Sequence, residues 1–145
     1  MVDRRLIFSS FGVLPVTANF SIGNPEHIDQ EPFPESGNLH RKLTEPLGCT
    51  EMRVNTVTLA PGDATAPHSH EQQEEVYIAL DGGHVQIDGA RHEVSPGSVV
   101  RIGADAVRSV RNETESDDQT WIMCGAPPVG SADDFGEYTM PSDDG

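Results

Sequence analysis

The sequence predicts an all-β domain, built as a sandwich or a jelly-roll barrel. Helical periodicity is weak along the chain, whereas short segments rich in valine, isoleucine, threonine and aromatic residues recur at roughly 8- to 12-residue intervals. Turn sequences such as APGD, DGG, DGA and SPGS lie between them and favour tight connections between strands. The length of 145 residues suits a single domain with one core.

The strand pattern divides the chain into an arm, a barrel and a tail. We expect strands at 6–8, 37–43, 53–59, 76–80, 84–87, 91–94, 99–102, 108–111 and 120–124. Residues 1–37, with several prolines, are expected to form an arm and a surface loop that pack on the barrel at 38–127. Residues 128–145 are rich in acids, glycine and proline, which predicts an extended tail without chemistry of its own.

The charge of the chain argues against polyanionic partners. Lysine and arginine number 9 against 24 aspartates and glutamates, which gives a formal net charge of −15. Such a chain has no general affinity for nucleic acid or for an anionic membrane. The acids are spread over the whole length, as in proteins of halophilic organisms, where high ionic strength screens the self-repulsion.

Cysteine usage and the N-terminus predict a cytoplasmic protein. Cys49 and Cys124 are too few for a disulfide framework and are expected to be free thiols in a reducing compartment. No stretch reaches the roughly 18 apolar residues of a membrane span. Arg4 and Arg5 precede an apolar run, but Pro15 breaks that run and no small-residue cleavage site follows.

The stretch APHSHEQQEEVYIAL carries a candidate metal site. In an extended segment alternate side chains share a face, so His68 and His70 point the same way. Glu74 and Glu75 follow after a short turn, at the start of the next strand. Two imidazoles and a carboxylate are ligands that divalent first-row metals accept, with positions left open for a substrate.

The wider spacing resembles the first motif of the cupin superfamily. Five residues separate the first motif glycine from the first histidine, one separates the histidines, four precede the glutamate, and six precede the last glycine. The matching positions are Gly62, His68, His70, Glu75 and Gly82. This spacing selects Glu75 as the inward carboxylate and leaves Glu74 facing solvent.

A second cupin-like motif lies at SPGSVVRIGADAVRSVRN, with one departure. Its turn, strand and last position are matched by Pro96, Gly97, Ile102 and Asn112. Arg108 stands where the family usually has a histidine, and Gly103 and Asp105 replace the usual proline and glycine. The resemblance, over about residues 38–127, implies a small jelly-roll β-barrel and, as in many such cupins, a homodimer. It also implies a divalent metal (Fe, Mn, Ni, Zn or Co) on His68, His70 and Glu75, without the fourth ligand.

Arg108 leaves two interpretations open, because a guanidinium stays protonated and cannot ligate a metal. In the first, a metal is present and a small anionic organic molecule bridges it to Arg108. Without that bridge, a divalent ion and a guanidinium about 5 Å apart would repel by roughly 7 kcal/mol at an effective dielectric constant of about 20. In the second, Glu75 pairs directly with Arg108 and no metal binds.

These alternatives predict different functions. The first is a metal-dependent enzyme of the isomerase or oxygenase type seen among cupins, acting on a small anionic substrate held by Arg108, with Glu75 or Tyr77 nearby. The second is a non-catalytic cupin that binds or senses a small molecule in a pocket lined by the histidines, Tyr77 and Trp121.

Overall fold

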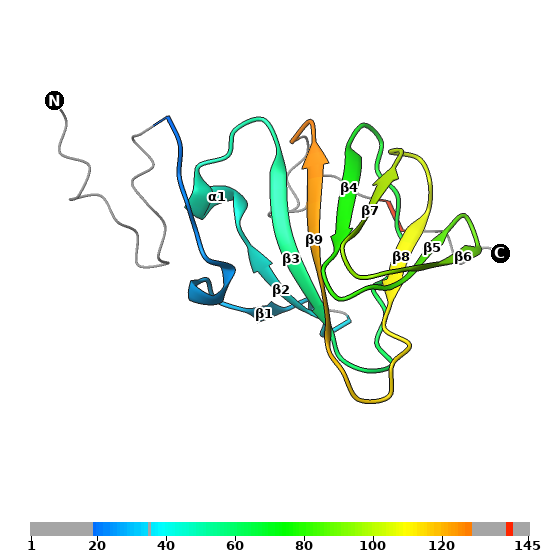
Figure 1. The fold of residues 1–145 in the computed structure, drawn as a ribbon. Helices are drawn as coiled ribbons and strands as arrows, with labels where there is room; N and C mark the ends of the chain where they lie inside the picture. The colour runs from blue at the N-terminus through cyan, green and yellow to red at the C-terminus, as the bar shows by residue number, and fades with distance from the viewer. Residues whose placement is uncertain (1–18, 35, 129–138, 141–145) are drawn as a thin grey trace, which may run out of the picture.

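Two antiparallel β-sheets pack face to face in the computed structural model, which describes residues 19–34, 36–128 and 139–140 (Figure 1). The larger sheet has the strand order β1-β2-β3-β9-β4-β7 and the smaller one the order β6-β5-β8. The strands of the larger sheet are β1 (Glu31–Pro32), β2 (Leu39–Lys42), β3 (Arg53–Leu59), β9 (Gln119–Ala126), β4 (Glu74–Ala79) and β7 (Ser98–Ile102). Those of the smaller sheet are β6 (Ala90–Val94), β5 (Gly83–Ile87) and β8 (Arg108–Arg111). The all-β prediction is confirmed.

Most of the expected strands lie where the sequence predicts them. β3 and β8 have the predicted bounds, and the other matched strands differ by one or a few residues at their ends. The first expected strand, 6–8, lies outside the described residues. No helix within the described part of the chain is long and apolar enough to cross a bilayer.

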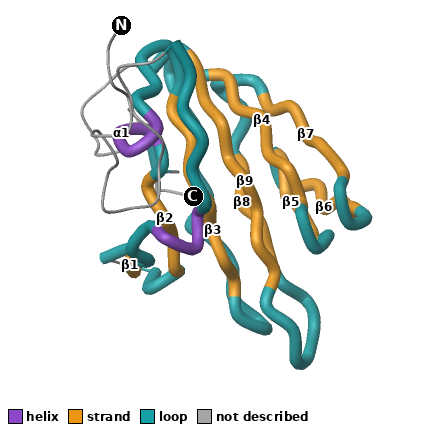
Figure 2. The backbone as a smooth tube through the Cα atoms, turned by 60° about the vertical axis from the view of Figure 1, so that its left-hand side comes forward, coloured by secondary structure: helices purple, strands orange, loops and turns teal. Residues whose placement is uncertain are grey.

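Three short elements were not predicted. The first is a single-turn 3-10 helix, η2 (Pro25–His27). β1 lies in the proline-rich segment, where Glu31 and Pro32 pair with His40 and Leu39. The helix α1 (Thr44–Leu47) lies beside β2 and β3, at one end of the larger sheet (Figure 2). α1 is a single turn that ends at Gly48 in the left-handed conformation, too short to show a periodic pattern.

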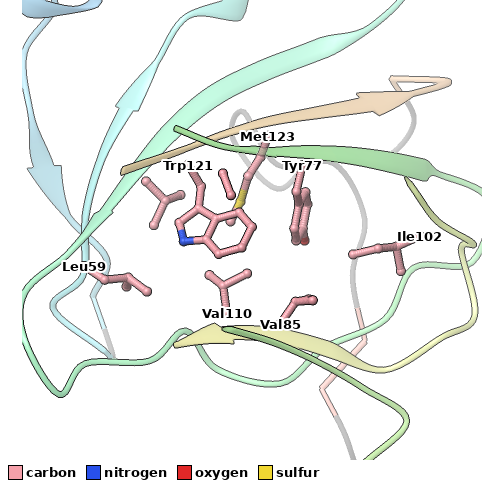
Figure 3. Close-up of a cluster of buried hydrophobic side chains, with 9 residues drawn as sticks. Leu59, Tyr77, Val85, Ile102, Val110, Trp121 and Met123 are labelled. Atoms are coloured by element: carbon pink, nitrogen blue, oxygen red, sulfur yellow. The ribbon is translucent and has the colours of Figure 1, made fainter. Parts of the chain in front are cut away.

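The core fills the space between the sheets. Figure 3 shows Trp121 and Tyr77 from the larger sheet above Val85 and Val110 from the smaller one. The rings of Trp121 and Tyr77 meet edge to face, with centroids 6.4 Å apart. Gly83 permits this packing, because a Cβ there would lie 2.8 Å from the Trp121 ring.

The segment before β4 extends the smaller sheet. Isolated bridges pair Ala64 with Arg111 and His68 with Arg108, so this segment runs antiparallel to β8. A further bridge pairs Ser69 with Thr139, from the C-terminal part of the chain. The two histidines of the predicted site therefore lie on a segment with β8 on one side and Thr139 on the other.

Candidate metal centre

Three potential metal ligands meet inside the barrel. His68 and His70 come from the segment before β4, and Glu75 comes from β4 itself. Their ligand atoms all lie within 4.8 Å of one another. The predicted juxtaposition of these residues is present in the fold.

Backbone pairing with β8 and with the loop before it explains why both imidazoles face inward. The His68 N–H donates to the Arg108 carbonyl at 3.0 Å, and the Arg108 N–H donates to the His68 carbonyl at 2.8 Å. The His70 N–H donates to the Ala104 carbonyl at 2.7 Å. Alternation along this extended segment then places His68 and His70 on one face, with their rings edge to face and 5.1 Å apart.

The two glutamates at the start of β4 point to opposite faces. Glu75 is 9% exposed, whereas Glu74 is exposed and its Oε2 lies 2.6 Å from Nε of Arg101 on the neighbouring strand. The choice of Glu75 as the inward carboxylate is confirmed.

Four side chains converge on one oxygen of Glu75. The Tyr77 hydroxyl donates a 2.8 Å hydrogen bond to Oε1 of Glu75. Nε2 of His70 lies 3.1 Å from the same oxygen and Nε2 of His68 lies 4.0 Å from it. Nε of Arg108 approaches it to 3.3 Å. This carboxylate is therefore the centre of the site.

Arg108 is fully buried and is held by the loop before β8. Its two terminal nitrogens donate to the carbonyls of Ala104 at 3.1 Å and Gly103 at 2.8 Å. The remaining guanidinium nitrogen, Nε, faces Glu75. An inward Arg108 agrees with the sequence-based expectation. These carbonyls could not be predicted, because backbone acceptors carry no side-chain signal.

A family comparison agrees with this architecture. Residues 55–124 match the model of the cupin domain. The chain therefore contains a cupin domain. No curated protein sequence matches it.

Solved structures similar to this cupin share its fold at low sequence identity. A sugar phosphate isomerase from Silicibacter pomeroyi is 20% identical, with 84% of this chain and 92% of that one covered and a TM-score of 0.65. A predicted oxalate decarboxylase from Thermotoga maritima is 18% identical, with coverage of 73% and 98% and a TM-score of 0.64. A cupin protein from Bacteroides fragilis is 23% identical, with coverage of 76% and 95% and a TM-score of 0.56.

The environment of this cupin site holds Glu75 ionised and His68 neutral. Burial alone would raise the pKa of Glu75, but the contact with His70 and the charges of His70, Arg108 and His68 outweigh burial and lower that pKa. For His68, burial is the main effect and lowers the pKa, although the Ala66 carbonyl and Glu75 act in the opposite sense. Burial, and then the charge of Glu75, raise the pKa of Tyr77 well above its ordinary value. Tyr77 is therefore a hydrogen-bond donor at neutral pH.

The donor set fits a divalent metal. Nδ1 of His68 lies 3.1 Å from the Ala66 carbonyl, a contact that favours the tautomer with the proton on Nδ1. Nε2 of His68, the atom nearer Glu75, then keeps its lone pair for a metal. Neutral imidazoles with an ionised carboxylate are the forms that bind such ions.

The remaining predicted pocket residue lies deeper than the candidate ligands. Trp121 is fully buried and pairs with Ala79, one inward position further along β4 than Tyr77. It contacts Tyr77, which in turn contacts Glu75. Trp121 thus supports the floor of the site through Tyr77.

Gln73 is 1% exposed beside the site, and its role was not predicted from the sequence. Its amide lies over Gly125, the β9 partner of Glu75, and a Cβ on Gly125 would lie 2.6 Å from Cδ of Gln73. The Gln73 amide also donates to the Pro127 carbonyl at 3.2 Å. Only the inward alternation from Glu75 could have indicated this position.

Proposed function

We propose that this cupin binds a divalent first-row transition metal through His68, His70 and Glu75 and acts on a small anionic organic molecule. The observation that carries the proposal is the cluster of three ligand atoms within 4.8 Å of one another inside the barrel. The reaction class we propose is isomerase or oxygenase chemistry.

The charges of the site favour an anionic ligand. The carboxylate of Glu75 and the guanidinium of Arg108 cancel each other, with Nε and Oε1 only 3.3 Å apart. A divalent ion ligated by imidazoles in their neutral, metal-binding form would leave a net charge of about +2 in the site. A carboxylate or phosphate group on the substrate would lower that charge and ligate an open position of the metal.

The side chains of the site have distinct roles in this proposal. A bound metal would polarise a carbonyl or hydroxyl group of the substrate as a Lewis acid. Tyr77, protonated and fully buried, orients Glu75 through its 2.8 Å hydrogen bond. Arg108 supplies fixed positive charge, because the carbonyls of Gly103 and Ala104 hold it in place.

The names of two similar structures accord with an anionic substrate. One is described as a sugar phosphate isomerase and the other as a predicted oxalate decarboxylase. Sugar phosphates and oxalate are both small anions. At 20% and 18% identity these likenesses show the fold alone, so the substrate class is argued from the charges of the site.

The direct contact between Glu75 and Arg108 favours a second candidate function. The ion pair neutralises both buried charges without a metal. In that case the protein is a non-catalytic cupin that binds or senses a small molecule.

Metal content and turnover separate the two functions. The protein is purified without added metal and compared with His68→Ala by elemental analysis. For the enzyme, we expect nearly one equivalent of metal per chain in the unaltered protein and none in the variant. We also expect turnover of sugar phosphates or small dicarboxylates when metal is restored. If neither protein contains metal, and a ligand raises the melting temperature without turnover, the result would support the non-catalytic binding function.

We also propose that the protein is a cytoplasmic homodimer. Light scattering at low and at high salt tests the oligomeric state, and a monomer in both would refute it.

A further inference from the structure

The C-terminal part of the chain contacts the site at two separate points. At the first, the Ser69 N–H donates to the Thr139 carbonyl at 2.8 Å and the Thr139 N–H donates to the Ser69 carbonyl at 2.6 Å. Ser69 lies between the two histidines of the candidate metal centre. At the second, the Pro127 carbonyl accepts from the amide of Gln73, two residues before Glu75.

We propose that the C-terminal segment positions the candidate metal ligands through these two contacts. Thr139 acts on His68 and His70 through the backbone of Ser69, and Pro127 acts on the start of β4 through Gln73. The metal-related part of this inference rests on the proposed function. The positioning of the histidine segment can be measured without metal.

Isolated β-bridges on both sides place the histidine segment between two neighbours instead of at an edge. His68 and His70 bond through their backbones to Arg108 and Ala104, while Ser69 bonds in the opposite direction to Thr139. Without Thr139 the Ser69 N–H and carbonyl would have to turn to water, and the histidine segment would become an edge. An edge segment samples more conformations, so its imidazoles would be less well organised for a metal.

Gln73 provides the matching contact on the glutamate side. Its side chain is 1% exposed, and it rests on Gly125, the β9 partner of Glu75. The hydrogen bond to Pro127 therefore links the end of β9 to the residue that leads into Glu75. The two contacts connect both ligand-bearing segments to the same C-terminal stretch.

Substitution of the residue that makes the first contact tests the proposal. Thr139→Pro removes the N–H that donates to Ser69, and Thr139→Ala keeps it. A chain that ends at residue 138 loses both hydrogen bonds, and a chain that ends at Met140 keeps them. Asn24→Ala is a stability control, because it removes an exposed backbone-capping contact with Glu26 in the N-terminal part of the chain.

The first readout is made on metal-free protein. We expect the Ser69 amide to exchange with solvent much faster in the chain ending at residue 138 than in the chain ending at Met140, with shifted imidazole signals of His68 and His70. Unchanged exchange and unchanged imidazole signals would overturn the proposal, whatever the protein binds.

The second readout is the affinity of each folded variant for Co²⁺. We expect Thr139→Pro to weaken binding roughly fivefold, the factor that corresponds to one hydrogen bond of about 1 kcal/mol, and the loss of both bonds to weaken it more. Thr139→Ala and Asn24→Ala should bind Co²⁺ like the unaltered protein. Equal affinity in all variants would overturn the positioning role. Failure of the unaltered protein to bind Co²⁺ would instead count against the proposed function and leave the exchange result to decide the positioning.

Discussion

Nε of Arg108 lies 3.3 Å from Oε1 of Glu75, in a site where both side chains are buried. The guanidinium is anchored on the opposite side by the carbonyls of Gly103 and Ala104. A positive charge is thus built into the protein at the β8 position where many cupins place a histidine. We expect this charge to weaken the binding of a divalent metal and to favour an anionic ligand beside it.

Replacement of Arg108 by histidine should strengthen metal binding. The variant removes the repulsion between the guanidinium and a divalent ion and adds an inward imidazole on β8 as a fourth ligand. We expect Co²⁺ or Zn²⁺ to bind at least about tenfold more tightly, as measured by calorimetry. Arg108→Gln is the control, since it removes the charge without adding an imidazole. An affinity of Arg108→His no higher than that of the unaltered protein would contradict a metal site at these residues.

Removal of the Tyr77 hydroxyl should destabilise the metal-free protein. Tyr77→Phe deletes a 2.8 Å hydrogen bond to an ionised, buried carboxylate. We expect the free energy of unfolding in urea to fall by about 1.5–3 kcal/mol, the range for hydrogen bonds to charged groups. The same substitution in a Glu75→Gln background should cost less, because the charge is gone. An equal cost in both backgrounds would show that the hydroxyl does not act through the carboxylate.

Acidification should weaken the fold through His68 and Glu75. The folded-state pKa of each lies below its ordinary value, so the unfolded chain binds more protons and stability rises with pH. The contribution of His68 is complete above about pH 6.5 and that of Glu75 above about pH 4.3, and each is lost as the pH falls through its lower, folded-state pKa. Urea unfolding at fixed high salt, from about pH 8 down to about pH 2, measures the effect.

His68→Gln should flatten the upper part of this pH profile and Glu75→Gln the lower part. High salt screens the titration of the many surface acids, and comparison with the unaltered protein isolates each group. Profiles that keep the same slope in both variants would refute the assignment.

A methyl group on Gly125 should disturb the wall beside Glu75. Its Cβ would lie 2.6 Å from Cδ of Gln73, so the buried amide would have to move and lose its bond to Pro127. We expect Gly125→Ala to lower the free energy of unfolding by about 1–3 kcal/mol. Gly103→Ala is the matched control, because the nearest atom to its Cβ would be 4.0 Å away. Equal effects of the two substitutions would contradict the packing described for Gln73.

Local patterns were sufficient to predict much of the barrel and the inward ligands. Strand-forming residues between turn sequences predicted the bounds of β3 and β8, and the motif spacing selected Glu75 over Glu74. These features depend on the two-residue period of a strand and on turn chemistry, both of which are visible in a short stretch of sequence.

The features that sequence analysis missed depend on contacts between distant segments. α1 is a single turn with Pro46 inside it, and its position is set by packing on β3. The carbonyls that hold Arg108 belong to a loop whose conformation could not be predicted from its side chains. The tail was expected to have no chemistry, yet Thr139 pairs with Ser69 between the two histidines. A backbone bridge of this kind does not depend on the side chains and therefore has no pattern in the sequence.

Anomalous diffraction from crystals soaked in Co²⁺ locates the metal directly. We expect one peak inside the barrel, within about 2.0–2.3 Å of Nε2 of His68, Nε2 of His70 and a carboxylate oxygen of Glu75. The Glu75–Arg108 distance should lengthen from the present 3.3 Å as the carboxylate turns to the ion. A barrel without a peak at saturating Co²⁺, or a peak only on surface carboxylates, would contradict a metal centre at these three residues.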